Sequence, residues 1–454
     1  MASLFDNYKK IISLGCPILI GQLGMIVVGF ADNAMVGNYH TDALAAASFV
    51  NNVFNIAVMM CIGFTYGLTP IIGALYSKGE NHSIGVTLRD ALRLNIIFSL
   101  SLTLLMGVLY FNIHRLGQPA HILPLIRPYY LLYLAGVIPI AVFQSFAQWA
   151  YAVNSTKMPM WIILSANAVN ILGNWLLISG NLGMPELGLT GAGIATLAAR
   201  LICPLATFTI FLKVKRYRCY HDGFFRSSTQ LLRKRLSRLF TTSMPVSLQM
   251  GLETASFSVA AIMAGWLGDK ELAAFQVLLI TGTLGFCVYY SFGTAISVVV
   301  ANAAGRNDLH EMRRKAWCGY HIILVFAAIA SLTFLLFGSS LVRIFSSDPK
   351  VLSLAMSCIF PMILYQLADA TQITFSNALR GTSRVMPIFY TSLISYVIIG
   401  IPVTYIMGIL SGWGLPGIYY SFSVSLMCAA ALYIYFFFNT ISEKQWNRLK
   451  TSTK

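Results

Sequence analysis

Charged side chains are scarce in this chain of 454 residues. Asp, Glu, Lys and Arg together make up 10% of the sequence, whereas a soluble globular domain usually carries about 25%. Acidic residues are the rarer kind, with 15 Asp and Glu against 31 Lys and Arg. Because 57% of the residues are hydrophobic, too few charges remain to cover a water-exposed surface. The composition therefore excludes a soluble globular protein.

The patterns that bind metals or carry out catalysis are also missing. The eight cysteines are scattered and form no CxxC pair, and the seven histidines show no metal-ligand spacing. A disulfide framework and a zinc site are therefore excluded, and we expect no cofactor apart from a coupling ion, Na⁺ or H⁺. The HExxH and GxSxG motifs are absent as well. We accordingly expect that the chain is not an enzyme, which also argues against an intramembrane protease.

Long apolar segments are what the chain has instead. Each of them is long enough to cross the hydrocarbon core of a bilayer, which is about 30 Å thick. We therefore predict an all-α membrane protein with twelve transmembrane helices. The predicted segments lie near residues 11–37, 44–75, 88–111, 122–153, 158–180, 189–213, 241–267, 271–303, 316–345, 351–379, 385–409 and 414–440.

The basic residues gather in every second connection between these segments. The even-numbered connections contain Lys78, Arg89, Arg93, Lys157, the cluster from Lys213 to Arg238, Arg306, Arg313, Arg314, Lys315, Arg380 and Arg384. The odd-numbered ones contain little beyond Arg115, Lys270, Arg343 and Lys350. Lysines at both termini, among them Lys9, Lys444, Lys450 and Lys454, share the side of the even connections.

This asymmetry predicts where the chain resides. Cytoplasmic loops of membrane proteins carry an excess of Lys and Arg, so we expect both termini in the cytoplasm. No cleavable signal peptide is visible at the start of the chain, and we expect the bacterial inner membrane. The net charge of +16 then reports topology and contact with membrane lipids. Nucleic acid is not an expected partner, and we expect a monomer.

The two halves of the sequence resemble each other. When the sequence is shifted by 228 residues, Pro17 falls on Pro245, MVG at 35–37 falls on MAG at 263–265, and LAA at 44–46 falls on LAA at 272–274. Each half contains six predicted helices, so both enter the membrane from the same side. We predict two pseudo-symmetric six-helix bundles around a central cleft. Their expected bounds are 1–212 and 241–440, with a basic cytoplasmic linker at 213–240 and a cytoplasmic tail at 441–454.

Three acidic residues lie inside the apolar segments: Asp32, Glu253 and Asp369. A charged side chain at the centre of a membrane helix costs about 2.5–3.5 kcal/mol on insertion scales. None of the three recurs in the other half at the shift of 228, so the repeated scaffold does not require them. A buried carboxylate is neutralised by a proton or by a bound cation, and either can be exchanged across the membrane. The alternative is a protonated acid that only donates a hydrogen bond between helices.

Polar residues accompany these acids at helical spacing. Tyr365, Asp369 and Gln372 lie on one face, and so do Gln249 and Glu253, which predicts that both faces meet a cavity. The candidates for a substrate cavity are Gln22, Asn51, Asn55, Gln249, Ser256, Gln276, Gln372 and Ser376. Arg200 also lies inside a predicted span, where it could pair with Asp32 or contact a lipid phosphate.

Several motifs resemble those of the multidrug and toxic compound extrusion (MATE) family, in particular its NorM-like bacterial branch. They are FADNAMVG at 30–37, GMPELGLTGAGIAT at 183–196, Pro245 with Glu253 eight residues later, and YQLADATQITFSNALRG at 365–381. The resemblance covers nearly the whole chain. It implies twelve helices in two bundles and a cation-driven export of organic cations and drugs.

The resemblance also implies roles for individual residues. In NorM-like members the positions of Glu253, Asp369 and Tyr365 are associated with the coupling cation. A second site in the first bundle maps to Asp32, Asn170, Asn174 and Thr196. Some relatives have an aspartate where this chain has Asn174, so the first-bundle site carries one charge less here.

Two functions remain open from the sequence. The first is an antiporter that exports organic cations in exchange for Na⁺ or H⁺ by alternating access. The alternative is a flippase for lipid-linked saccharides, a related architecture. A flippase of this kind would need basic residues in its cavity for a pyrophosphate, and the only basic residue expected there is Arg200.

Overall fold

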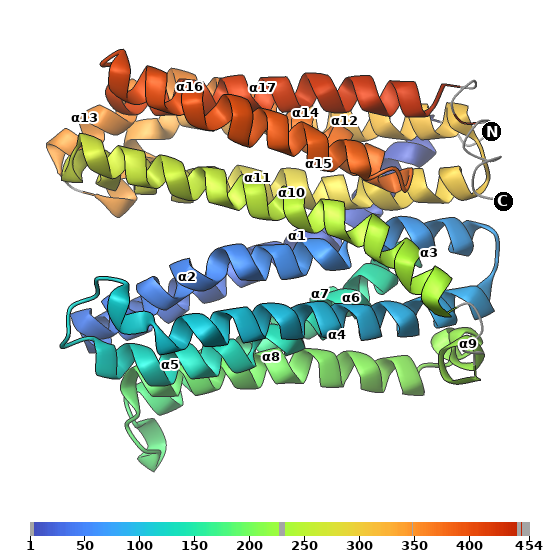
Figure 1. Ribbon diagram of the computed structural model, residues 1–454, viewed down its shortest axis with the longest axis horizontal. Helices are drawn as coiled ribbons and strands as arrows, with labels where there is room; N and C mark the ends of the chain where they lie inside the picture. The colour runs from blue at the N-terminus through green and yellow to red at the C-terminus, as the bar shows by residue number, and fades with distance from the viewer. Residues whose placement is uncertain (1–3, 227–231, 347, 443–445, 447–454) are drawn as a thin grey trace. The chain divides into compact units, whose positions relative to one another are not determined.

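The computed structural model describes residues 4–226, 232–346, 348–442 and residue 446 (Figure 1). Helices make up nearly all of this part of the chain, and no strand occurs within it. The tail lysines Lys444, Lys450 and Lys454, and most of the predicted tail at 441–454, lie outside the described residues.

The helices fall into two compact units. One unit, which we call the N-terminal unit, comprises Ile20–Leu68 and Gly79–Ser247. The other, the C-terminal unit, comprises Met1–Leu19, Thr69–Lys78 and Leu248–Lys454. Helices α1 (Leu4–Tyr39) and α10 (Leu232–Leu267) therefore contribute residues to both. The predicted boundaries at 212 and 241 stay a prediction. Residues 1–19 and 69–78, which precede them in the sequence, belong to the C-terminal unit.

The N-terminal unit is built from long helices that lie side by side (Figure 1). Beyond parts of α1 and α10 they are α2 (Thr41–Thr65), α4 (Asn81–Phe111), α5 (Leu123–Ala135), α6 (Val137–Ala152), α7 (Lys157–Ile178) and α8 (Gly188–Lys213). Short turns of helix join or follow them: η1 (Ile113–Arg115), η2 (Asn181–Gly183), η3 (Lys215–Tyr220) and α9 (His221–Arg226).

In the C-terminal unit, helix α14 (Ile359–Gly381) lies among its neighbours and is buried along most of its length. It packs against α11 (Asp269–Gly305), α12 (Leu309–Phe345) and α17 (Gly414–Thr440). The remaining elements are α3 (Leu68–Ser77), α13 (Pro349–Ser357), α15 (Met386–Ser392), the π-helical segments η4 (Leu393–Gly400) and η5 (Ile406–Leu410), and α16 (Ile401–Tyr405).

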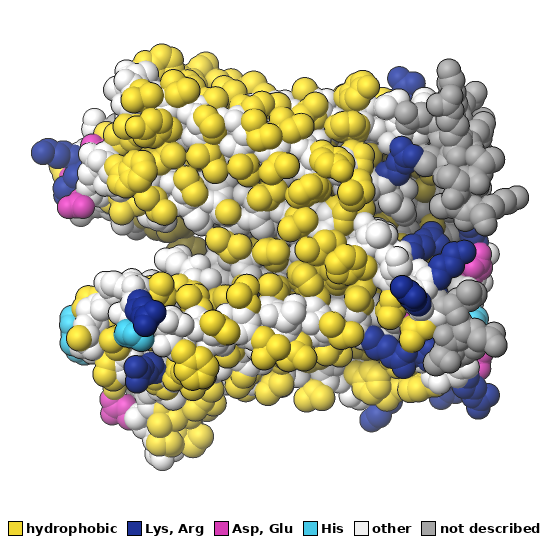
Figure 2. Space-filling model, in the orientation of Figure 1, with side chains coloured by type: hydrophobic (Ala, Val, Ile, Leu, Met, Phe, Trp, Pro, Cys, Tyr) yellow, Lys and Arg dark blue, Asp and Glu magenta, His cyan; other side chains and the backbone are white. Residues whose placement is uncertain are grey.

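The prediction of twelve spans is confirmed. In the described part of the chain, eleven helices or continuous helix pairs are long and apolar enough to cross a membrane. A twelfth span is made by α13 and α14, which meet at a bend of 51°. Many large apolar side chains on these helices are exposed, for example Leu104 and Leu105 at 64% each, and they cover much of the face shown in Figure 2. Such a surface requires lipid, so the chain is an integral membrane protein.

The linker predicted at 213–240 is folded in its described part. The end of η3 and helix α9 touch α4 closely, since a Cβ atom on Gly85 would lie 2.1 Å from the Tyr220 carbonyl oxygen. A Cβ atom on Gly223 would lie 2.0 Å from the His82 carbonyl oxygen. Glycine is required at both positions because only a residue without a side chain permits this backbone contact. Helix α10 then begins at Leu232, ahead of its predicted start at 241.

Three charged residues that the sequence placed in loops or at helix ends are in fact buried. Asp90 on α4 is fully buried, Lys315 on α12 is 2% exposed and Arg380 on α14 is 3% exposed. Lys315 is paired with Glu311, at 2.7 Å. Asp90 accepts a hydrogen bond of 2.7 Å from Arg235 Nε at the start of α10, and Arg89 and Arg93 lie at 3.6 and 3.7 Å. The early part of α10 thus supplies an ion-pair partner, Arg235, within the N-terminal unit.

We expect Asp90→Ala to lower the free energy of unfolding by about 3–5 kcal/mol, the usual cost of removing one member of a buried ion pair. The reason is that Arg235 and Arg89 would keep their charges without the carboxylate. The measurement is the thermal unfolding temperature of the detergent-solubilised protein. Asp222→Ala, which removes an exposed partner of Arg226, is the control and should change it little. Equal shifts for both variants would contradict the structural role of Asp90.

Candidate functional site

Two acids of the C-terminal unit are brought together by a single amide group. Gln372 Nε2 donates to Glu253 Oε1 at 3.4 Å and to Asp369 Oδ1 at 3.2 Å. Glu253 is on α10, whereas Asp369 and Gln372 are one turn apart on α14. The two helices therefore place two carboxylates around one donor, and the predicted role of both acids at a coupling cation stays a prediction.

Two oxygen atoms of this cluster have no hydrogen-bond donor. They are Asp369 Oδ2 and Gln372 Oε1, both buried and without a partner among the described residues. A buried acceptor without a donor costs about 1–3 kcal/mol. The cluster thus has a deficit of positive charge or of protons, which a cation or a proton would remove.

A very small cavity adjoins the cluster. Its volume is about 10 Å³, which is the space that one water molecule needs. Side chains from three helices line it: Gln249, Met250 and Glu253 of α10, Phe286 and Tyr290 of α11, and Gln372, Ile373, Ser376, Asn377 and Arg380 of α14. A cavity of this size has room for a water molecule or a small ion and excludes an organic molecule.

Arg380 is part of this site, which the sequence analysis missed. Its Nη1 donates to Asn377 Oδ1 at 3.0 Å, and its Nη2 donates to Gln249 Oε1 at 3.3 Å. The guanidinium is close enough to act electrostatically on Glu253. The signal that could have revealed it is helical spacing, because Arg380 continues the face of Asp369, Gln372 and Ser376.

Tyr365 lies one turn before Asp369 on α14 and is 8% exposed. Its ring packs edge-on against Phe257, with centroids 6.4 Å apart, and near Phe422 at 6.2 Å. Among the described residues no hydrogen bond joins its hydroxyl to either acid. Tyr365 is therefore next to the cluster, and its predicted role at the coupling cation stays a prediction.

The N-terminal unit holds the other predicted site. Asn174 on α7 donates to Asp32 Oδ1 on α1 at 2.5 Å and to Asn170 Oδ1 at 3.3 Å. Asn170 in turn donates to Thr196 Oγ1 on α8 at 3.1 Å. The structure thus joins the four residues predicted from the resemblance in one chain of hydrogen bonds.

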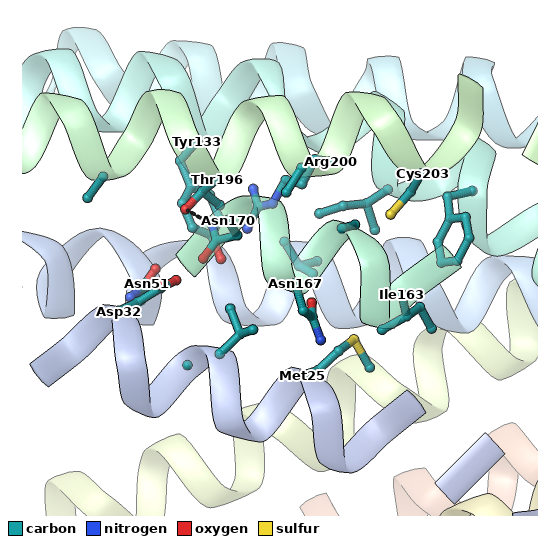
Figure 3. A pocket seen from close by; sticks show the side chains of 18 of the residues that line it. Met25, Asp32, Asn51, Tyr133, Ile163, Asn167, Asn170, Thr196, Arg200 and Cys203 are labelled. Atoms are coloured by element: carbon teal, nitrogen blue, oxygen red, sulfur yellow. Dashed lines mark hydrogen bonds between the residues drawn. The ribbon is translucent and has the colours of Figure 1, made fainter. Parts of the chain in front are cut away.

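A much larger cavity opens beside this chain of hydrogen bonds (Figure 3). Its volume is about 420 Å³, within the range of about 300–1,000 Å³ that is usual for drug-sized ligands. Polar groups project into it from Asp32, Asn51, Asn167, Thr196 and Arg200. Its remaining wall is mostly apolar and aromatic, with Met25, Tyr129, Tyr133 and Phe143 among the residues that line it.

Four of the candidates for a substrate cavity lie elsewhere. Asn55 and Gln276 are exposed, and Gln22 and Ser256 are partly buried. None of them lines either cavity. Their predicted place in a substrate cavity stays a prediction, and the polar character of a membrane-helix residue does not itself show which face of the helix meets the unit's interior.

Arg200 lines the large cavity. Its guanidinium carbon lies 4.0 Å from the centroid of the Tyr133 ring, which is a cation–π contact. Within the described residues, no ion pair of 4.0 Å or less joins it to Asp32, so the direct pairing considered from the sequence is not formed. The lipid phosphate contact considered as the alternative stays a prediction.

Comparison with known proteins places these sites in context. The family model described as MatE matches twice, at residues 17–176 and at 245–406. The two matches begin 228 residues apart, which confirms the internal repeat. A multidrug resistance protein NorM of Vibrio cholerae is 28% identical over 436 residues, covering 94% of this chain and 95% of that protein. A probable NorM of Geobacillus kaustophilus is 27% identical, covering 95% and 94%.

Solved structures support the same fold. A eukaryotic MATE transporter aligns with a TM-score of 0.88 at 19% identity, covering 99% of this chain and all of that one. A multidrug resistance MATE family transporter in an outward-facing conformation aligns with a TM-score of 0.84 at 18% identity, covering 96% of each chain. At such low identity the agreement concerns the fold alone.

We expect Gln372→Leu to lower the free energy of unfolding by about 1–3 kcal/mol, since the buried carboxylates lose their shared donor. The cost should be smaller in a Glu253→Met background, where one of the acceptors is already gone. The four proteins of this cycle are compared by thermal unfolding in detergent. Equal costs in both backgrounds would show that Gln372 does not interact with Glu253.

Proposed function

Because the chain belongs to the MatE family of multidrug efflux transporters, we propose that it exports organic cations and drugs in exchange for Na⁺ or H⁺ by alternating access. The observation that carries the proposal is the pair of acids joined by Gln372, since Glu253 and Gln372 line a cavity with room for a small ion only and Asp369 shares the Gln372 donor. Export leaves the substrate chemically unchanged, so no catalytic residue is needed. We propose that it works as a monomer in the bacterial inner membrane, with both termini in the cytoplasm.

The two cavities support a division of labour. The small one offers carboxylate and amide oxygens, which suit a hard cation or a proton. The large one has the volume and the apolar, aromatic wall that suit an organic molecule. We therefore propose that the coupling ion binds at Glu253 and Asp369, with Tyr365 next to them, and that the organic substrate binds in the N-terminal unit. Asp32, Asn170, Asn174 and Thr196 would then belong to the substrate cavity and to a second site for a proton or cation.

The coupling follows from the cost of an unneutralised carboxylate. A cation or proton that enters from outside neutralises the cluster, and it leaves when the site opens to the cytoplasm. At a membrane potential of about 100 mV each charge moved inward supplies roughly 2.3 kcal/mol. That energy corresponds to an accumulation of the exported substrate of roughly fifty-fold.

The flippase alternative is less well supported. A lipid-linked saccharide carries a pyrophosphate, which needs several basic groups. Arg200 is the only Lys or Arg among the residues that line the large cavity, and Asp32 opposes it there. The charge of the cavity therefore does not favour a strongly anionic headgroup.

Glu253→Gln and Asp369→Asn are each expected to abolish export, because the amide can no longer exchange a cation or a proton. Export of a fluorescent organic cation is measured in vesicles, and its accumulation should fall to the level of vesicles without protein. Asp269→Asn, at the exposed start of α11, should retain full export. Membrane insertion of each variant is checked by detergent extraction and size-exclusion chromatography. Normal export by both site variants would disprove the coupling role.

The two unpartnered oxygens lead us to expect Na⁺ as the coupling ion, because a metal cation is held by several oxygen ligands at once, whereas a proton needs one. In vesicles with an imposed Na⁺ gradient and no pH difference, export should proceed at the full rate. With a pH gradient and no Na⁺, it should be at least about tenfold slower. The reverse result would assign the coupling to H⁺, and transport without either gradient would rule out an antiporter.

A further inference from the structure

An open groove lies between α4 and α10 in the N-terminal unit, and it shares no lining residue with either cavity described above. Its volume is about 430 Å³. Helix α4 contributes Leu94, and one face of α10 contributes the other lining residues. These are Leu232, Arg233, Leu236, Ser237 and Phe240. Four of the six lining residues are thus large and apolar, and Arg233 is the one charged group among them.

The groove lies where both helices change from charged to apolar. On α4, Arg93 directly precedes Leu94, and large apolar side chains such as Ile97 are exposed after it. On α10 the basic residues end at Arg238, and Phe240 is exposed two residues later. In a membrane protein such a change marks the boundary between lipid headgroups and hydrocarbon. The groove therefore faces both parts of a lipid molecule.

The charge around the groove is positive. Figure 2 shows basic side chains gathered around the beginning of α10. Among the described residues, Arg233, Lys234 and Arg238 are exposed and form no ion pair of 4.0 Å or less. Asp90 on α4 does not neutralise them, because it is fully buried and already binds Arg235. Such a basic surface at headgroup level attracts an anionic headgroup.

Arg233 is suited to hold a phosphate at this place. The stem of an arginine can lie on an apolar surface while its guanidinium reaches the headgroups, and Arg233 is exposed on the wall of the groove. A guanidinium binds two phosphate oxygens through parallel hydrogen bonds. Ser237 lies one turn later on the same face of α10 and adds a hydroxyl donor. The groove thus offers donors for a phosphate next to an apolar wall for hydrocarbon.

We propose that this groove binds an anionic phospholipid, with its phosphate on Arg233 and Ser237 and one acyl chain along the apolar wall formed by Leu94, Leu236 and Phe240. A zwitterionic phospholipid is a weaker ligand, because the positive end of its headgroup would face the basic residues. The apolar wall also argues against a free phosphate, which would leave it uncovered. The inference is independent of the proposed export function, since the groove shares no residue with the sites assigned to the ion and the substrate.

Two phospholipids with the same acyl chains test the proposal. Dioleoylphosphatidylglycerol is anionic, whereas dioleoylphosphatidylcholine carries no net charge. The purified full-length protein in detergent is mixed with both lipids at equal concentration, and the bound lipids are identified by native mass spectrometry. The wild type should bind phosphatidylglycerol at least about fivefold more tightly than phosphatidylcholine, which is the effect of one basic side chain at a membrane surface.

Three variants locate the site. Arg233→Gln should lower the affinity for phosphatidylglycerol about fivefold and leave phosphatidylcholine unchanged. Ser237→Trp fills the groove without changing its charge, so it should weaken the binding of both lipids. Arg216→Gln removes an exposed basic residue that does not line the groove and should change neither affinity. All three positions are exposed, so the variants are expected to fold, which size-exclusion chromatography checks.

Several results would overturn the lipid site. Equal affinity of the wild type for the two lipids would show that the basic residues do not select the headgroup. Equal losses for Arg233→Gln and Arg216→Gln would assign the preference to the general charge of the surface. Oleate that displaces phosphatidylglycerol at equal concentration would assign the groove to a fatty acid. A lipid-free dimer that Ser237→Trp dissociates would make the groove an interface between copies of the chain.

Discussion

The neutralisation of buried carboxylates is the constraint on which the rest of the molecule depends. Asp369 is 2% exposed and shares one amide donor with Glu253, and its Oδ2 has no donor among the described residues. The missing hydrogen-bond donor lowers the stability of this part of the structure. In a transporter the missing partner can be an ion that binds from one side of the membrane and leaves to the other. If every oxygen of the cluster had a donor, the structure would be more stable, and the cluster would gain little free energy from binding an ion.

The two units meet this constraint in different ways. In the C-terminal unit Glu253 lines a cavity of about 10 Å³, and Arg380 lines the same cavity. In the N-terminal unit Asp32 is bound by the Asn174 amide and lies beside a cavity of about 420 Å³. The two halves thus share a similar scaffold, and polar residues that are not repeated give the two units cavities of different size and lining. This division explains why the acids do not follow the internal repeat.

Much of the fold was predictable because a bilayer imposes simple rules on sequence. Apolar segments of about twenty residues marked all twelve spans, and motifs recurring at 228 residues marked the two halves. The polar faces around Asp369 and Glu253 were also visible, because helical spacing brings such residues to one side. The residues of the N-terminal site came from the resemblance to a family, and spacing alone would not have joined Asp32 to Asn174.

What remained hidden concerns the ends and faces of helices. Asp90, Lys315 and Arg380 were predicted as loop or helix-end charges, yet each of the three is buried and has a polar or charged side-chain partner. Asn55 and Gln276 were predicted to line a cavity; both are exposed, and that prediction stays untested because hydropathy does not show which face of a helix a polar residue occupies. The space for the Arg200 side chain depends on Gly136, because a Cβ atom there would lie 2.7 Å from Arg200 Nη1. The two residues are 64 positions apart, so only the tertiary structure reveals this contact.

The contact between Gly85 and Gly223 has a consequence for the evolution of the chain. A segment that only connected two fused copies would drift freely in length and composition. Here it became part of the first copy, since its backbone rests on α4 without an intervening side chain. Across related chains the two glycines should therefore be lost or retained together, and their covariation would record the step at which a flexible connection became a structural element.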